Sequence, residues 1–547
     1  MRIIYVMKKL TFTVSSLLII FVALCCAKKK VNSSVGELNP GLLNGVNIKS
    51  LIVVDLNDEK QTIENFGASD CWTTKFIGKW SDTKKKNLIA DYLFSMDTTS
   101  NGNPIGIGLS LWRFNIGAGS FEQGVASEIP DEFRREECFL SPDGKYDWSK
   151  QAGQQWFLNA AKKRGVGDFL AFSISPPVQF TINDRAFGLG TSQLNLKPGS
   201  ENNFADFLVN LVQHFNQAGF NMRYLSPVNE PQWDWGDKKS TQEGSGALNS
   251  EIANFVKILG PKLNNTKTKI ALGEAAQWNF LYAPHDKRGD QLNDFFNPKS
   301  SDYIGDVPNL ENLFSAHSYF TTCPDDSLIK IRQDAFNKKN QVSPSLKLWQ
   351  SEFGILGDIC GKYNGYPKNT GIDYGLYVAK VIYHDLAIAN VSAWQWWLAV
   401  DTYDYSDGLV YINDPSGGYD LNAMKTDGIV SDSKQLWCLG NYSRFVRPGM
   451  IRVGASINTI PDDITAASSQ MITAYKNPAK KELVIVIVNI ETRDMEFSID
   501  PSKVNLTNDQ MFAYTTDATH SLGKTIVNSN SVIIPAKSVV TLVGNYK

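Results

Sequence analysis

The chain has 547 residues, which exceeds one ordinary compact unit but accommodates a barrel of about 250 residues together with a smaller domain. Its net charge of −2 provides no basic surface for nucleic acid, and its 5 histidines argue against a multi-histidine metal cluster. We therefore expect no nucleic-acid partner, no metal and no cofactor. The 13 tryptophans exceed the needs of core packing, and broad aromatic faces suit flat, hydroxyl-rich ligands such as sugars.

Residues 1–26 have the pattern of an export signal. A basic start at Met7 precedes the apolar run LTFTVSSLLIIFVALCC, which is too short and wrongly flanked for a membrane span. A cysteine that closes such a run resembles a bacterial lipoprotein signal, so we expect acylation at Cys25 or Cys26. The residue before each cysteine is not the usual small one, and plain secretion is the alternative. The expected location is the outer membrane, on its periplasmic or outer side, with the lipid anchor as the only membrane contact.

Residues 27–48 are polar and punctuated by Gly and Pro, and they indicate a tether between this signal and the folded part. Two short strand-like pieces follow, SLIVVDL and QTIENFG. The cysteines beyond the signal are odd in number and contain no CxxC pair, which favours buried free thiols. A bridge between Cys323 and Cys360 would require their loops to lie side by side.

Helix-like and strand-like segments then alternate along the chain. Apolar residues at helical spacing predict helices over 149–164, 201–218, 250–263 and 372–389. Apolar strand candidates follow each of them. This alternation predicts parallel strands with helical crossovers, and at this length the natural form is a (β/α)8 TIM barrel, over residues 67–437.

After about residue 440 the pattern changes to short strands separated by polar turns, with no helical period visible. We interpret residues 438–547 as an antiparallel β side domain, a β-sandwich. The early strands within 50–66 have no helix beside them, so they are expected to pair with it. The side domain would thus be built from both ends of the folded chain.

Four acids follow apolar strands: Asp70, Glu230, Glu274 and Glu352. Active sites of such barrels lie at the C-terminal ends of the strands, and hydrolysis of a glycosidic bond needs two carboxyl groups. A single strand-end acid is more often an ordinary loop residue or helix cap. Glu230 and Glu352, however, are separated by a length that corresponds to three βα units, which places them after strands four and seven.

The sequence around these acids resembles glycoside hydrolase family 30, from about residue 50 to the end, and most closely its endo-β-1,6-galactanase-like branch. The matching motifs, in chain order, are NFGASD at 65–70, LSLWRFNIGAG with Arg113, SISPP at 173–177, VNEP with Asn229 and Glu230, AHSYF with His317 and Tyr319, WQSEFG with Glu352, WQWW with Trp396 and Trp397, and LGNYSRFVRPGMIRV at 439–453. The departures are the absence of a tryptophan after SPP, and GEAAQ at 273–277, which does not align with a family motif.

The resemblance implies a retaining mechanism with Glu352 as nucleophile and Glu230 as acid/base. Arg113 or Tyr319 would keep Glu352 ionised, Asn229 would bind the 2-hydroxyl of the sugar, and His317 would support the nucleophile or a sugar hydroxyl, unless it is a satisfied core residue. The other candidate substrate contacts are Asp70 and Trp72 at the sugar hydroxyls, Trp397 or else Trp396 under the sugar ring, and Trp233 on a sugar beyond the cleavage point.

The expected substrate is a β-linked polysaccharide or oligosaccharide, and the branch resemblance favours β-1,6-galactan, as in arabinogalactan side chains. A β-1,6-glucanase or a xylanase-type enzyme is the alternative within the family. A non-catalytic glycan-binding lipoprotein is the alternative from another class, although a binding module does not need two strand-end acids.

Overall fold

The computed structural model describes residues 50–547. The predicted signal peptide with Cys25 and Cys26, and the predicted tether 27–48, lie outside the described residues. Within residues 50–547, no helix combines the length and the apolar character that a membrane span needs.

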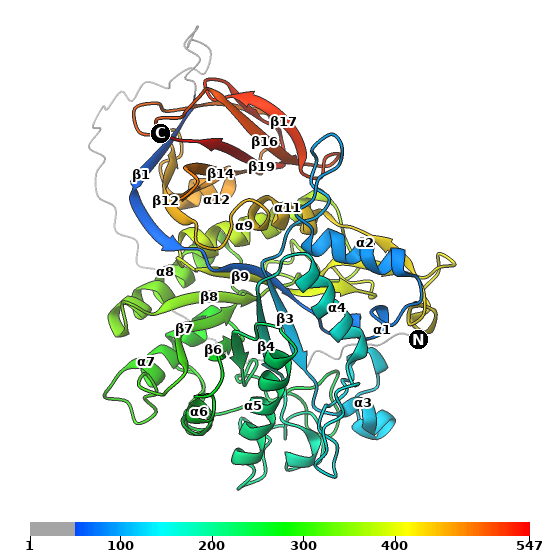
Figure 1. The fold of residues 1–547 in the computed structure, drawn as a ribbon. Helices are drawn as coiled ribbons and strands as arrows, with labels where there is room; N and C mark the ends of the chain where they lie inside the picture. Colours follow the sequence, from blue (N-terminus) through cyan, green and yellow to red (C-terminus); the bar gives the residue numbers. More distant parts are fainter. Residues whose placement is uncertain (1–49) are drawn as a thin grey trace, which may run out of the picture. The chain divides into compact units, whose positions relative to one another are not determined.

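Eight parallel strands close into a barrel, because the last of them, β9, pairs with both β8 and the first strand, β2 (Figure 1). The predicted (β/α)8 architecture is confirmed. Two further strands, β10 (Gly408–Asn413) and β11 (Ile429–Ser431), extend the sheet beyond β9. The barrel strands are β2 (Asn65–Ser69), β3 (Leu111–Ile116), β4 (Asp168–Ser173), β5 (Tyr224–Ser226), β6 (Lys269–Ala275), β7 (Leu310–His317), β8 (Lys347–Glu352) and β9 (Ala393–Asp401).

Amphipathic helices surround the barrel. In α5 (Glu201–Gln217), Phe204, Leu208 and Leu211 recur at helical spacing and are all buried, so this face packs on the strands. The four predicted helices form within a few residues of their expected bounds. The helices are α1 (Thr74–Ile77), α2 (Thr83–Phe94), α3 (Ser120–Gln123), α4 (Ala152–Lys163), α5, α6 (Asn249–Lys262), α7 (Gln291–Phe296), α8 (Asp325–Val342), α9 (Ile372–Ala387), α10 (Leu421–Met424), α11 (Lys434–Ser443) and α12 (Asp463–Ser468).

The side domain is one sheet in the order β17-β16-β19-β14-β13-β12-β1-β15-β18, mostly antiparallel, with β1 and β15 parallel. Its central hydrophobic cluster includes Ile52 from the start of the folded chain and Ile485 and Leu542 from its end. The predicted union of both chain ends is therefore present (Figure 1). The strands are β1 (Ser50–Thr62), β12 (Ile451–Ile457), β13 (Gln470–Asn477), β14 (Glu482–Asn489), β15 (Met495–Ile499), β16 (Gln510–Thr516), β17 (Gly523–Asn528), β18 (Val532–Ile534) and β19 (Ser538–Asn545).

Two details of the side domain differ from the sequence interpretation. The first expected strand, SLIVVDL, continues to Thr62, because the pairing of β1 with β12 extends to Thr62 opposite Ile451. The second expected piece, QTIENFG, is divided between the end of β1 and the start of β2. The barrel's first strand then starts at Asn65. A helix, α12, also interrupts the β region, and the carboxylate of Asp462 caps it by accepting a hydrogen bond from the Thr465 N–H.

Hydrogen bonds attach the side domain to the barrel. Asn441, on α11, donates to the Tyr514 carbonyl (2.9 Å) and to the Thr541 hydroxyl (3.0 Å). The N–H of Ile63, where the chain passes from β1 to β2, donates to the Met450 carbonyl (2.8 Å). The barrel interior contains a separate apolar cluster that includes Leu111, Phe172 and Trp349.

Candidate active site

Glu230 and Glu352 stand at the C-terminal ends of the fourth and seventh barrel strands, β5 and β8, as predicted. Glu230 has a φ of 44°, a backbone conformation that persists in a non-glycine residue only where its surroundings fix it. Its N–H donates to the Glu274 carbonyl (2.8 Å), and its carbonyl accepts from the indole N–H of Trp235 (3.1 Å). These bonds aim the Glu230 carboxyl group into the barrel mouth.

The two carboxyl groups are close together. One carboxylate oxygen of Glu230, one of Glu352 and a ring nitrogen of His317 all lie within 4.8 Å of one another. Retaining glycosidases place their carboxyl groups about 5–5.5 Å apart, whereas inverting enzymes leave about 6.5–9.5 Å for a water molecule. The separation here fits direct attack by a carboxylate.

Glu352 is held by two donors, Arg113 from the second barrel strand and Tyr319 from just after the sixth. Arg113 Nη1 donates to Glu352 Oε2 (2.6 Å), and the Tyr319 hydroxyl donates to Glu352 Oε1 (3.1 Å). Arg113 also donates to Asn229 Oδ1 (2.9 Å), and its guanidinium group lies over the Phe172 ring. The NH2 group of Asn229 thus remains free to donate to a sugar hydroxyl.

Glu274 occupies the centre of this network, although the sequence reasoning did not select it. Its Oε2 atom accepts from Arg113 Nη2, His317 Nε2 and the Ser351 hydroxyl, each at 2.9 Å. Burial alone would raise its pKa, but Arg113 and His317 outweigh burial and lower the pKa to about 2. The position of Glu274 after an apolar strand was a usable signal, whereas GEAAQ matches no family motif.

His317 lies between Glu230 and Glu274. Its Nδ1 is 2.8 Å from Glu230 Oε1, and its Nε2 faces Glu274. Burial opposes the charged ring, but the carboxylates of Glu352, Glu230 and Glu274 outweigh burial and raise the pKa of His317 to about 10. With both ring nitrogens protonated, His317 can donate one hydrogen bond to Glu230 and one to Glu274.

The environments of the two catalytic candidates differ. Burial raises the pKa of Glu230, and the Glu352 carboxylate raises it further, against the opposing effect of His317. A carboxyl group that keeps its proton can act as an acid. Glu352 instead receives a charge-assisted hydrogen bond from Arg113.

Trp72 and Trp397 lie together near the ends of the first and eighth barrel strands, and Asp70 directly follows the first of these strands, β2. The Trp72 and Trp397 rings pack edge to face, 5.2 Å between centroids. Asp70 Oδ1 accepts from the Asn115 N–H (2.8 Å), and the Gln154 side chain of α4 also faces the Asp70 carboxylate. Asp70 and Trp72 are buried, with 0% and 2% exposed, so their expected contacts with a sugar stay predictions.

Trp396 does not lie with this group, and its prediction as a substrate contact is wrong. It is fully buried in the cluster between the barrel and the helices, and its indole donates to the Asp407 carbonyl (2.7 Å). Trp397 belongs to the cluster inside the barrel. Successive side chains of a strand point to opposite faces, so the adjacent indoles of Trp396 and Trp397 lie on opposite sides of the sheet.

Trp233 and Trp235 are both half-buried. Trp233 packs edge-on against Phe280, 6.0 Å between centroids. Trp235 packs on Gly244, besides its bond to the Glu230 carbonyl. The expected stacking of Trp233 on a sugar stays a prediction.

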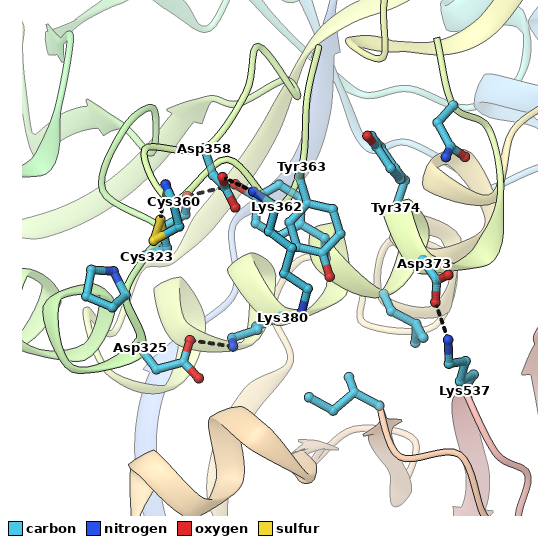
Figure 2. A pocket seen from close by; sticks show the side chains of 16 residues that line it. Cys323, Asp325, Asp358, Cys360, Lys362, Tyr363, Asp373, Tyr374, Lys380 and Lys537 are labelled. Carbon is cyan, nitrogen blue, oxygen red and sulfur yellow. Dashed lines mark hydrogen bonds and ion pairs between the residues drawn. A yellow bond between two sulfur atoms is a disulfide. The ribbon is translucent and has the colours of Figure 1, made fainter. Parts of the chain in front are cut away.

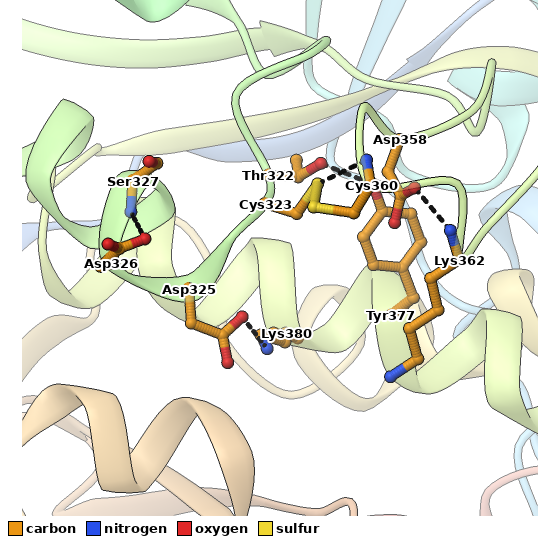
Figure 3. Close-up of a disulfide and its surroundings, with 10 residues drawn as sticks. All are labelled: Thr322, Cys323, Asp325, Asp326, Ser327, Asp358, Cys360, Lys362, Tyr377 and Lys380. Carbon is orange, nitrogen blue, oxygen red and sulfur yellow. Dashed lines mark hydrogen bonds and ion pairs between the residues drawn. A yellow bond between two sulfur atoms is a disulfide. The ribbon is translucent and has the colours of Figure 1, made fainter. Parts of the chain in front are cut away.

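A disulfide joins the loops that follow the sixth and seventh barrel strands. Cys323 and Cys360 are bonded, with Cα atoms 6.2 Å apart, and the Thr322 and Tyr377 hydroxyls lie 2.7 Å apart beside them (Figure 3). A cavity of about 730 Å³ lies next to this bridge, and Figure 2 shows ion pairs of Asp325 with Lys380 and of Asp373 with Lys537 in its wall. Its lining includes neither catalytic carboxyl group. The remaining described cysteines are buried free thiols.

A parallel barrel with this carboxylate pair at its mouth defines a retaining glycoside hydrolase. Residues 49–411 match the sequence profile of O-glycosyl hydrolase family 30, and the chain belongs to this family of enzymes that act on β-glycans.

Among known proteins, an endo-β-1,6-galactanase from Hypocrea rufa is 24% identical over 460 residues, which covers 80% of this chain and 81% of that protein. The crystal structure of a conserved exported protein from Bacteroides fragilis is 35% identical, with a TM-score of 0.84 over 90% of this chain and 100% of that chain. The catalytic domain of a family 30 xylanase C from Talaromyces cellulolyticus is 22% identical and shares the fold, with a TM-score of 0.64 over 90% of this chain and 100% of that chain.

Proposed function

We propose that the protein is a retaining hydrolase of β-1,6-galactan, with Glu352 as nucleophile and Glu230 as acid/base. The single observation that carries these roles is the close carboxylate pair, in which Arg113 and Tyr319 hold Glu352 while burial raises the pKa of Glu230.

In the first step Glu230 gives its proton to the glycosidic oxygen, and Glu352 attacks the anomeric carbon to form a covalent glycosyl-enzyme. In the second step Glu230, now ionised, takes a proton from water, which displaces Glu352 and restores the original configuration. Asn229 donates its NH2 group to the 2-hydroxyl of the sugar. Asp70, Trp72 and Trp397 bind the rest of that sugar.

The choice of galactan is supported by the endo-β-1,6-galactanase from Hypocrea rufa, which matches 80% of the chain. The test is incubation of the purified protein with β-1,6-galactan, β-1,6-glucan and glucuronoxylan, with the products resolved by chromatography. We expect release of galacto-oligosaccharides, and none with Glu352→Gln. Cleavage of only another polysaccharide would contradict the substrate, and activity in Glu352→Gln would contradict the assignment of the nucleophile.

The acid/base role has its own test. Glu230→Ala should be slow on an aryl β-galactoside and should be rescued by azide, which needs no base, with a β-galactosyl azide as product. An α-azide, or full activity without azide, would contradict the double displacement with Glu230 as its acid/base.

We also propose that the protein is exported and anchored to the outer membrane by a lipid on Cys25 or Cys26. The apolar run that ends in these cysteines supports this proposal, as does similarity to an exported protein of Bacteroides fragilis. Mass spectrometry of the protein from its host should find a diacylglyceryl group on the N-terminal cysteine. An unmodified N-terminus at Ala27 or later would indicate secretion.

A further inference from the structure

A buried ion pair lies behind the catalytic network, on the neighbouring helices α8 and α9 (Figure 1). Arg332 Nε on α8 donates to Asp385 Oδ1 on α9 (2.8 Å), and both side chains are fully buried. Burial of two charges costs free energy that their mutual attraction often only balances, so added stability does not by itself account for such a pair. The contacts of its other polar atoms indicate a different role.

The Asp385 carboxylate contacts the end of the sixth barrel strand. Ser318 directly follows β7, and its hydroxyl donates to Asp385 Oδ2 (2.9 Å). The neighbours of Ser318 in the chain, His317 and Tyr319, contact the two catalytic carboxyl groups with their side chains. Because successive side chains of an extended chain point to opposite sides, a bond that holds Ser318 from behind also fixes the two residues that face the barrel mouth.

Two tryptophans set the direction of this bond. Trp278 Nε1 donates to the Ser318 hydroxyl (2.9 Å), so the hydroxyl proton is left to donate to Asp385. Trp394 Nε1 donates to the same carboxylate oxygen, Asp385 Oδ2 (2.9 Å). A buried carboxylate with three donors has a well-defined position, and it fixes the position of Ser318 in turn.

The Arg332 guanidinium holds the next turn of the chain. Its Nη1 donates to the Thr321 carbonyl and to the Thr321 hydroxyl (3.2 Å), and that hydroxyl donates to the Ser318 carbonyl (3.1 Å). Between these two residues, Phe320 has a φ of 56°, a conformation that a non-glycine residue keeps only where its surroundings fix it. The ion pair thus holds both ends of the short segment that carries Tyr319.

The same segment is bonded to the residue assigned as nucleophile. The Ser318 N–H donates to the Glu352 carbonyl (3.3 Å), and the Tyr319 hydroxyl donates to the Glu352 carboxylate (3.1 Å). Functional groups must be held within about 0.5 Å of their productive geometry, and a misplacement of about 1 Å can reduce the rate about 100-fold. A small shift of this strand end would therefore slow catalysis.

We propose that Asp385 and Arg332 are positioning residues of the hydrolase, which hold His317 and Tyr319 against the catalytic carboxyl groups by way of the strand end at Ser318. Both charged side chains are fully buried, so they act through these residues and not on the substrate. This inference rests on the proposed roles of the two catalytic carboxyl groups.

The first test measures kcat and KM of Ser318→Ala and Asp385→Asn on the glycan that the wild type cleaves. We expect kcat to fall about tenfold in Ser318→Ala and about 10- to 100-fold in Asp385→Asn, with KM within about twofold, because the displaced groups act in the transition state. The double variant should be no slower than Asp385→Asn, since both changes break the same link. If Asp385→Asn does not fold, Ser318→Ala, which leaves the ion pair intact, carries the test.

Asn441→Ala is the matched control. It removes two hydrogen bonds between α11 and the side domain, so it should lower the melting temperature and leave kcat unchanged.

A second readout does not depend on turnover. Ring N–H protons of a charged histidine that donate to carboxylates resonate far downfield in proton NMR spectra, and His317→Gln identifies the signals of His317. These signals should move or broaden in Ser318→Ala and Asp385→Asn, and they should stay in place in Asn441→Ala.

Wild-type values of kcat and unmoved signals in both variants would overturn the positioning role. An equal fall of kcat in Asn441→Ala, or a rise of KM at unchanged kcat, would also overturn it. If Glu352→Gln retains activity, the proposed roles of the carboxyl groups fail by themselves, and the NMR comparison still decides whether the ion pair positions His317.

Discussion

Glu274→Gln removes one negative charge from the catalytic network while it preserves the shape of the side chain. With Glu230 protonated, the network balances the positive Arg113 and His317 against the negative Glu274 and Glu352. Without the Glu274 charge, the excess positive charge favours ionisation of Glu230. The pKa of Glu230 should therefore fall, and the enzyme should lose its acid at lower pH.

The size of this effect follows from the geometry of His317. Glu230 and Glu274 contact opposite nitrogens of the ring at 2.8 and 2.9 Å, which puts the two carboxylates about 8 Å apart. At an effective dielectric constant of about 20, their repulsion is about 2 kcal/mol. Its loss would reduce the protonated fraction of Glu230 by up to about 30-fold on the alkaline side. Without the Glu274 charge, His317 also loses its proton more easily, and this loss of positive charge offsets part of the effect on Glu230. The 30-fold figure is therefore an upper value.

The assay is the pH profile of kcat/KM on the glycan that the wild type cleaves, together with the melting temperature. The alkaline limb of the profile should move to lower pH in Glu274→Gln. The matched control is Ser351→Ala, which removes one hydrogen bond to Glu274 but leaves its charge, so the limb should stay in place. An unmoved limb in Glu274→Gln, or an equal shift in Ser351→Ala, would refute the reasoning.

Four further predictions concern the same site and its surroundings. His317→Gln removes a positive charge that lowers the pKa of Glu230. The alkaline limb of the pH profile of kcat/KM should therefore move to higher pH in this variant, and a move to lower pH would contradict this. Folding raises the pKa of His317 from 6.5 to about 10, so the stability that protonated His317 contributes should be complete below pH 6.5 and lost as the pH rises to about 10. Denaturant unfolding of the wild type and of His317→Gln at several pH values would measure this difference in the free energy of unfolding. Replacing Cys323 and Cys360 by serine removes a crosslink between residues 37 positions apart and should lower the free energy of unfolding by about 2–4 kcal/mol. If neither the substitutions nor a reductant changes the melting temperature, the disulfide does not stabilise the protein. Dialysis against EDTA should leave hydrolysis undiminished, since both nitrogens of His317 are protonated and hydrogen-bonded, and activity restored by a divalent cation after complete loss would show that a metal takes part.

The helices and the two strand-end acids could be predicted because their signals are local. A helix such as α5 repeats apolar residues at its own period, and Glu230 and Glu352 each follow an apolar strand directly. In a parallel barrel all such strand ends meet at one mouth, so adjacent residues in the sequence suffice to place an acid there.

Glu274 shows where this local reasoning stops. The sequence placed it at a strand end, but its role depends on Arg113 from β3, His317 from β7 and Ser351 from β8, which only the closed barrel brings to one oxygen atom. The charge balance that sets the protonation of Glu230 is a sum over those strands, and no single segment carries it.

The amino-acid sequence by itself determined the barrel, the family and the two carboxyl groups, because strand and helix periods and short motifs are properties of neighbouring residues. Tertiary structure decided which face of β9 lines the barrel, and therefore that Trp397 and not Trp396 faces the interior, since this depends on how β9 pairs with β2 and β8. It also decided that Arg134 bridges Trp72 and Tyr403. These side chains come from loops after the first, second and eighth strands, and their contact arises only when β9 pairs with β2 and closes the barrel.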